Sequence, residues 1–220
     1  MHGTPVSSLL TEIVPLALAS AISPVLFLLQ VNTLTGARPF ARGAALTAGA
    51  AIVLIGVSSL GVALGGTGFS ERVTLQAILS IVLGALLLAI GLVALLRPKA
   101  SKTEAEDAKP KPPSIGHSFL AGVGGMGSNV TTFALYIPAL ALIAGSGLPL
   151  GQRGLAALTI LVLALMVAWV PLVLAAVVPG ATTRLLPALG RWLTANERWI
   201  QVALGVGFGI WLVAKGVRAL

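Results

Sequence analysis

The chain has 220 residues, of which 57% are hydrophobic and only 9% are charged, and its mean hydropathy is +1.02. Because a soluble domain usually carries about 25% charged residues, this composition excludes an ordinary soluble domain and indicates an integral membrane protein. The sequence contains no cysteine, which excludes disulfides, thiolate metal sites and thiol-based electron transfer. The net charge of +8 comes from basic residues at the ends of apolar segments, where they anchor topology, so we expect no nucleic-acid partner.

Six apolar segments are long enough to cross a bilayer, which takes about 20 mostly apolar residues for each helix. They predict an all-α membrane protein with six transmembrane helices. Because three is an odd number, two halves of three helices would lie in opposite orientations, so we expect two inverted three-helix repeats. Residues 1–96 form the first repeat, residues 97–114 a linker and residues 115–220 the second repeat. The expected helices are Ile13–Leu34, Ala44–Gly65, Val73–Leu96, Phe119–Ala144, Gly154–Val178 and Trp199–Leu220.

The first apolar segment is interrupted midway by Ser23 and Pro24. A proline inside a helix removes one backbone hydrogen bond and strains the preceding turn. In lipid this is tolerated where neighbouring helices, hydroxyl side chains or water satisfy the freed carbonyl. We therefore expect a kink at Ser23 and Pro24 that faces the protein interior near the middle of the membrane. The segment leaves through a short turn that carries Arg38 and Arg42.

Residues 97–114 form the hydrophilic stretch of the chain, with five basic residues, three acidic residues and four prolines. Low hydrophobicity and high proline content favour a disordered linker. The first, third and fifth connections together hold ten basic residues, whereas the opposite side holds four. The positive-inside rule then predicts that the linker is cytoplasmic and that both termini lie outside.

The fourth segment opens with glycines and then becomes polar. Residues 122–127 fit G-x-G-x-x-G, but a dinucleotide site also needs a preceding strand and a following acidic residue, and neither is present. Asn129 begins a glycosylation sequon, but at membrane depth we expect it to be unmodified. The segment is therefore interpreted as a glycine-weakened helix whose middle carries Asn129, Thr131, Thr132 and Tyr136.

A weak internal sequence repeat relates the two halves of the chain. Arg42–Thr47 opens the second helix with the pattern Arg-Gly…Thr, and Arg153–Thr159 opens the fifth in the same way. Upstream of each lies an interrupted helix, at Ser23-Pro24 and at Ser128-Asn129. Paired interruptions at corresponding positions of two inverted halves point to a transport site. The alternative is chance similarity between Ala- and Leu-rich segments.

The kinked Ser-Pro helix, the Arg-containing turn, the hydrophilic third connection and the Asn in the fourth helix together resemble the LysE superfamily. Within it the chain is most similar to the peptidoglycolipid- or sulfolipid-addressing (GAP/Sap) exporters, over nearly its whole length. The resemblance implies export across a bacterial cytoplasmic membrane, and the matching positions are Pro24, Arg38, Arg42 and Asn129.

Two other branches of the superfamily fit less well. Tyr136-Ile-Pro138 is similar to the cadmium-resistance branch, whose members carry acidic residues in the first and fourth spans. This chain has no acidic residue at those depths, so we expect no metal site. The electron-transferring DsbD-like branch needs membrane cysteines, which this chain lacks.

The leading functional interpretation is a secondary transporter that exports a small polar solute or a lipid-linked molecule. Uncharged polar groups at the midplane can hydrogen-bond such a substrate, but they lack the carboxylates that a hard cation needs. Each also has a structural explanation, since Ser and Thr often bond to their own helix and Asn can join helices. The expected pathway residues are Ser23, Pro24, Asn129, Thr131, Thr132 and Tyr136.

Glu12 stands at the outer mouth of the first helix and is a candidate for proton coupling. It can equally be a solvated residue that is favourable near a helix N-terminus. The alternative function is a non-transporting membrane scaffold or assembly factor for cell-envelope lipid export, in which the linker would be the working part.

An enzyme is not expected, because neither His2 nor His117 has a carboxylate or nucleophile at motif spacing, and no cofactor is implied. The expected partners are the lipid bilayer and a small-molecule or lipid substrate. The sequence leaves open the identity of the substrate, the coupling ion and whether the chain forms a homo-oligomer.

Overall fold

A computed structural model describes residues 6–35, 38–64, 73–96, 114–178 and 180–218. The regular structure in these ranges is entirely helical. In chain order the elements are α1 (Val6–Ser20), α2 (Pro24–Leu34), α3 (Pro39–Leu64), α4 (Val73–Leu96), α5 (Ile115–Gly127), α6 (Val130–Gly145), α7 (Leu150–Ala164), α8 (Met166–Val177), the short π-helix η2 (Ala181–Leu185) and α9 (Leu186–Arg218). Apart from Ser114, the expected linker lies outside the described residues.

Two continuous stretches within these ranges, Pro39–Val62 and Thr182–Arg218, are long and apolar enough to cross a membrane. Three further spans arise if each bent helix pair is counted as one span, which gives up to five among the described residues. The pairs are α1 with α2, α5 with α6 and α7 with α8, bent by 60°, 68° and 61°. The chain is therefore an all-α, multi-pass membrane protein, and six spans stay a prediction.

Every expected helix except Val73–Leu96 begins earlier than predicted, and the difference is largest for the sixth, because α9 begins at Leu186. Arg42 was expected in a turn, but it is the fourth residue of α3, which begins at Pro39. Proline is favoured at a helix start because its fixed φ suits the helix and its missing N–H is not needed there. Arg191 and Arg198 likewise lie inside α9, on its exposed face, and not in a connection.

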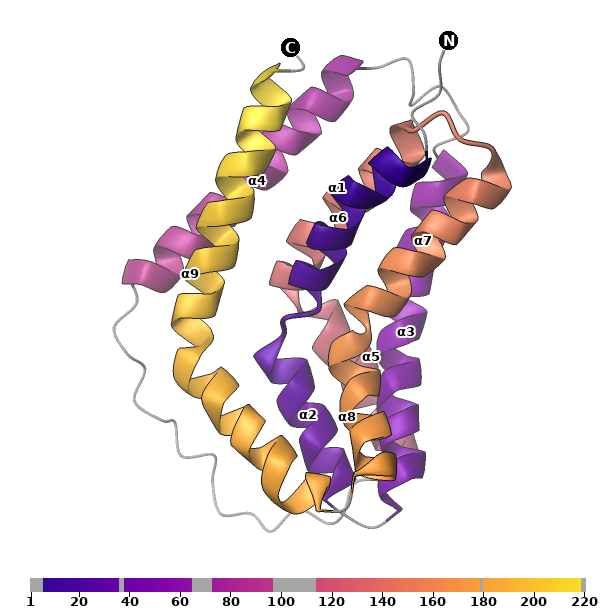
Figure 1. Cartoon of the computed structure of the whole chain (residues 1–220), viewed down its shortest axis with the longest axis vertical. Coiled ribbons are helices and arrows are strands. Elements are labelled where there is room, and N and C mark those ends of the chain that lie inside the picture. Colours follow the sequence, from indigo (N-terminus) through magenta and orange to yellow (C-terminus); the bar gives the residue numbers. More distant parts are fainter. Residues whose placement is uncertain (1–5, 36–37, 65–72, 97–113, 179, 219–220) are drawn as a thin grey trace.

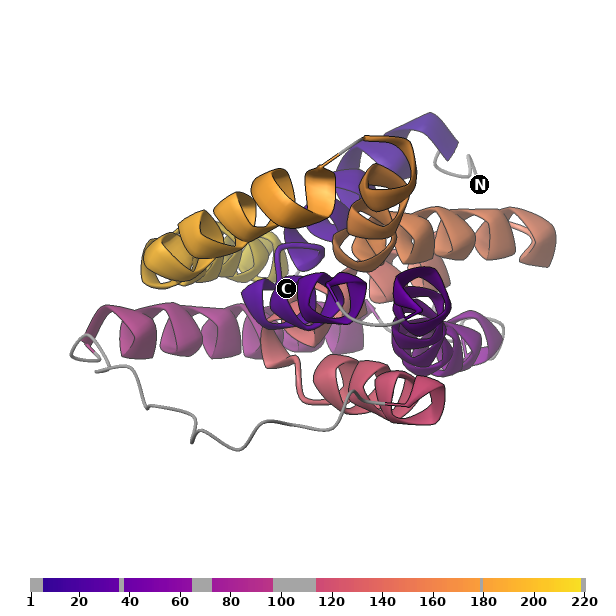
Figure 2. The ribbon, with the colours of Figure 1, turned by 90° about the horizontal axis from the view of Figure 1, so that it is seen from below.

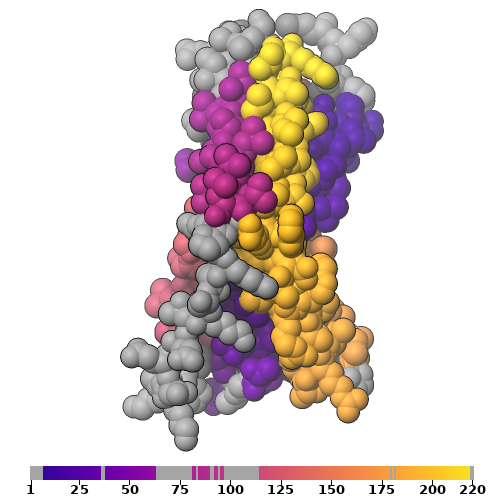
Figure 3. All heavy atoms as spheres, turned by 90° about the vertical axis from the view of Figure 1, so that its left-hand side faces the viewer, coloured from indigo at the N-terminus to yellow at the C-terminus, as the bar shows by residue number. Residues whose placement is uncertain are grey.

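The helices pack in two close pairs, and the two partners of each pair are far apart in sequence. α4 and α9 lie side by side, and α3 packs against α5 (Figure 2). Figure 3 shows the face formed by the first pair, with α4 beside the upper part of α9. A Cβ built on Gly84 of α4 would lie 2.9 Å from the carbonyl oxygen of Gly209 on α9, so these two helices cross through facing glycines.

The α3–α5 crossing is closer still. A Cβ on Gly49 would lie 2.1 Å from the carbonyl oxygen of Phe119, and a Cβ on Gly122 would lie 2.1 Å from that of Leu46. Small residues allow helix backbones to approach in this way in lipid, where apolar burial gives no net driving force for association. Gly122, the first glycine of the G-x-G-x-x-G pattern, therefore serves helix packing.

Candidate functional site: two broken helices that meet

The break between α1 and α2 follows from Pro24. A helix that continued through this point would need the N–H of residue 24 to bind the Ser20 carbonyl, and proline has no N–H. α1 accordingly ends at Ser20, and Pro24 becomes the first residue of α2. The Ser23 hydroxyl accepts a hydrogen bond from the Leu26 N–H over 3.3 Å and so caps the new helix. The helix is thus fully interrupted, where the sequence predicted a kink.

The break between α5 and α6 has the same form. α5 ends at Gly127, and Asn129 caps α6 by accepting a hydrogen bond from the Thr132 N–H on its side-chain oxygen, over 3.1 Å. The glycines of α5 weaken the helix before the break, because glycine loses more conformational freedom in a helix than other residues. Both breaks lie near the middle of the molecule (Figure 1).

The two breaks touch through their capping residues. The Asn129 amide donates a hydrogen bond from Nδ2 to the Ser23 hydroxyl oxygen over 2.7 Å, although the residues are 106 positions apart. The hydroxyl of Thr132 donates to the Ser20 carbonyl over 2.9 Å. Ser23, Thr132 and Ser20 are all at most 5% exposed. The predicted proximity of Ser23-Pro24 and Asn129 is confirmed, and their part in transport stays a prediction.

Two helix N-termini therefore meet at one point, where Ser23 is buried and Asn129 is partly buried. Each N-terminus carries the equivalent of roughly half a positive charge, because its first N–H groups lack helical partners. The capping oxygens of Ser23 and Asn129 satisfy one N–H of each helix. The arrangement can hydrogen-bond polar groups without any ionised side chain among the described residues at the meeting point.

Tyr136 lies two turns along α6 from Asn129 and is fully buried. Its hydroxyl lies 2.6 Å from the hydroxyl of Ser58 on α3. Ser58 donates its own proton to the Leu54 carbonyl over 2.7 Å, so Tyr136 is the donor in the pair. Thr131 is only partly buried on α6. The polar residues of α6 therefore contact different elements, α1 and the α1–α2 break near Asn129 and α3 near Tyr136.

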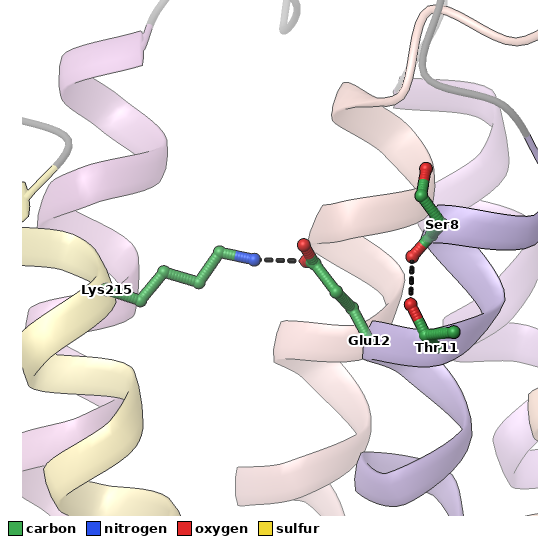
Figure 4. Close-up of polar contacts among 4 residues, drawn as sticks. All are labelled: Ser8, Thr11, Glu12 and Lys215. Atoms are coloured by element: carbon green, nitrogen blue, oxygen red, sulfur yellow. Dashed lines mark hydrogen bonds and ion pairs between the residues drawn. The ribbon is translucent and has the colours of Figure 1, made fainter.

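Glu12 and Lys215 form an ion pair between α1 and α9, at the end of the molecule where both termini lie (Figures 1 and 4). The side chains are 46% and 34% exposed, respectively, and the Lys215 ammonium also lies 5.3 Å from the centre of the Trp211 ring. Arg38 lies just before α3, with a positive φ of 52°, at the opposite end. Neither Glu12 nor Arg38 touches the meeting point of the two breaks.

The structure contains polar contacts that the sequence did not predict. Gln30 of α2 is fully buried, and its Nε2 donates to the Gly43 carbonyl over 3.3 Å. The Trp169 indole N–H donates to the carbonyl of Val162 over 3.0 Å at the bend between α7 and α8. A glutamine in an apolar helix is a usable signal, whereas the bend at Leu165 has no Gly or Pro at its position. In the described ranges no three His, Cys, Asp or Glu side chains gather as a metal site would require.

A comparison with protein-family models matches the family described as "Sap, sulfolipid-1-addressing protein" over residues 13–218. Searches of curated proteins and of solved structures gave no match. The match covers α1 from Ile13 onward and all of α2, α5 and α6, and it ends at the last residue of α9. The chain therefore belongs to the sulfolipid-1-addressing (Sap) family.

Proposed function

We propose that the chain is a secondary exporter that moves an amphipathic, lipid-linked molecule out of the cytoplasm, and that it is not an enzyme. The observation that carries the proposal is the 2.7 Å hydrogen bond between Asn129 and Ser23, which joins the starts of two half-helices. Half-helices whose N-termini point at a common site are how many transporters bind polar and anionic groups within the bilayer. The family name, sulfolipid-1-addressing, supports a lipid with an acidic headgroup as the molecule that is moved.

The contacts between helices support two inverted repeats. Exchanging the halves maps α1 onto α5, α2 onto α6, α3 onto α7–α8 and α4 onto α9. Contacts occur in matching pairs under this exchange: α4 with α6 and α9 with α2, α3 with α5 and α7 with α1. Arg42 and Arg153 are each the fourth residue of their helix. Under the same exchange Ser23 corresponds to Asn129, so their hydrogen bond lies where the two halves meet.

We place the protein in the bacterial cytoplasmic membrane as a member of the LysE superfamily, with both termini outside. α1 begins at the same end of the molecule as the C-terminal end of α9, and α3, whose fourth residue is Arg42, begins at the opposite end (Figure 1). A single cysteine at Ala105 tests the orientation, since the natural chain has no cysteine. We expect an impermeant thiol reagent to leave it unlabelled in intact cells and to label it after permeabilisation.

The test of the export function separates capping from the contact between the two halves. Asn129→Ser keeps a good helix cap but is too short to reach Ser23, whereas Asn129→Leu removes both interactions. In proteoliposomes with a fluorescent sulfated glycolipid, we expect both variants to lose export. We expect only the leucine variant to lose about 1 kcal/mol of stability from the missing cap.

Ser128→Ala is the matched control, because Ser128 is exposed and bonds only to the carbonyl of Gly124 in its own helix. It should export like the natural chain. Export by the purified chain alone also decides between the exporter and a scaffold, since a scaffold would move no lipid without partners. Wild-type rates in both Asn129 variants would refute the proposed site.

A further inference from the structure

A groove of about 710 Å3 lies between α3 and α7, away from the meeting point of the broken helices. Its walls are mainly apolar and include Ile55 of α3 with Leu158 and Leu161 of α7. Ile55 is 47% exposed and Leu158 is 54% exposed, so the groove opens on the lipid-facing side of the bundle. A volume of this size holds a ligand of several hundred daltons.

Arg153 is the charged residue among those that line this apolar groove. Arg153, in the first turn of α7, lines it, and its Nη1 lies 3.5 Å from the carbonyl oxygen of Val62 in the last turn of α3. This hydrogen bond from Nη1 is long compared with the usual range. The Nε of Arg153 is buried and has no hydrogen-bond partner. A buried donor of a charged group without an acceptor is costly, which favours a ligand that brings an anionic oxygen.

We propose that this groove binds an anionic membrane lipid, with its acyl chain along Ile55, Leu158 and Leu161 and its phosphate or sulfate headgroup at Arg153. The inference rests on the proposed export of a lipid and assigns a second site to it. Ser58 links the groove to α6, because it lines the groove and its hydroxyl is bonded to Tyr136, two turns along α6 from Asn129. Arg153 belongs to the helix start on the predicted outer side, so the groove is where a lipid would leave the protein sideways into the outer leaflet.

The experiment offers purified protein an equal mixture of phosphatidylglycerol and phosphatidylcholine with identical acyl chains, and counts retained lipids by native mass spectrometry. We expect the natural chain to prefer the anionic lipid. Arg153→Gln should reduce that preference about tenfold, which corresponds to the loss of one charge-assisted hydrogen bond. Arg153→Lys should keep part of it, because lysine is a point charge without the planar fork of arginine. Arg184→Gln removes an exposed cation from the opposite end and should change nothing.

A second variant tests the apolar part of the groove without touching the charge. Gly154 lines the groove, and a Cβ built on it meets no atom within 4 Å, so Gly154→Leu should fill the groove without strain. Gly151 is equally open but does not line the groove, which makes Gly151→Leu the matched control. We expect Gly154→Leu to lower the retention of both lipids and Gly151→Leu to leave it at the wild-type level.

Equal retention of the two lipids by the natural chain, or wild-type retention by both Arg153→Gln and Gly154→Leu, would overturn the groove assignment. These outcomes are separable from failure of the proposed function. If export depends on Asn129 but lipid retention does not depend on Arg153, only the assignment of the groove as a lipid site is wrong. If retention depends on Arg153 but the purified chain exports nothing, the groove stands as a lipid site and the exporter proposal is the part that fails.

Discussion

The hydroxyl of Thr132 donates a hydrogen bond to the backbone carbonyl of Ser20, in the place of the N–H that Pro24 cannot supply. A side chain of the second half thereby satisfies the backbone group that the break in the first half leaves open. An unsatisfied carbonyl in the hydrocarbon region costs several kcal/mol, so the interrupted helix depends on this partner. The break in α1–α2 and the sequence of α6 are therefore coupled.

Thr132→Val should lower the free energy of unfolding in detergent by about 1–3 kcal/mol, because it leaves the Ser20 carbonyl without a donor. Thr132→Ser, which keeps the hydroxyl, should lose much less. Pro24→Ala restores an N–H at residue 24, so Thr132→Val should cost less in that background. If Thr132→Val lowers the free energy of unfolding equally in the natural chain and in the Pro24→Ala background, the two positions are not coupled.

Gly122→Ala should destabilise the protein by about 2 kcal/mol or more, since its Cβ would lie 2.1 Å from a backbone oxygen of α3 that cannot easily move. Gly124→Ala, two residues along the same helix, meets no atom within 4 Å. It should be neutral or stabilising by up to about 1 kcal/mol, because alanine favours the helix. The two purified variants are compared by thermal unfolding. Equal melting temperatures would refute the close crossing of α3 and α5.

Trp169→Phe should destabilise the bend between α7 and α8, because it removes the indole donor of the Val162 carbonyl. The expected loss is about 1 kcal/mol, the net contribution of one hydrogen bond. Trp199 is 64% exposed on α9, and Trp199→Phe provides the control with little expected change. The measurement is the unfolding midpoint in detergent. A larger loss from the exposed tryptophan than from Trp169 would go against this account of the bend.

Glu12→Gln tests Glu12 as the proton-coupling residue, the role for which the sequence makes it a candidate, and it should stop the response of export to a pH gradient. The exposed pair with Lys215 contributes only about 0–1 kcal/mol to stability, so the variant should fold normally. Lys215→Gln removes the same ion pair but keeps the carboxylate, and it should retain the gradient response. Gradient-driven export that is unchanged in Glu12→Gln would eliminate Glu12 as the coupling residue.

The sequence predicted the breaks because each carries a local chemical cause. Pro24 removes a specific N–H, and Ser23 and Asn129 are preferred helix caps, so the positions of both breaks could be read from residue types. Their contact followed from the assumption that two halves of opposite orientation place equivalent breaks at the same depth. The helix at Val73–Leu96 was predicted with the bounds that α4 has.

Other features depend on neighbours that a single sequence does not show. The bend at Leu165 has no Gly or Pro at its position, and the Val162 carbonyl is satisfied by a side chain from the next helix. Gly122 differs from Gly124 in its neighbours, because Gly122 packs against the backbone of α3 and Gly124 does not. In a sequence with 26 glycines this difference cannot be recognised. Arg153 was visible as part of a repeat, but its groove requires α3 to lie beside α7.

The most direct test of the central claim is a reversible cross-link at the meeting point. The chain has no cysteine, so Ser23→Cys with Asn129→Cys creates a single thiol pair where the two side chains are now hydrogen-bonded. In proteoliposomes, oxidation should join residues 23 and 129. Neither the oxidised nor the reduced double variant should export the fluorescent sulfated glycolipid, because the hydrogen bond between Asn129 and Ser23 is absent from both. Failure of the cross-link to form, or export at the wild-type rate by the fully cross-linked protein, would contradict transport through the point where the two broken helices meet.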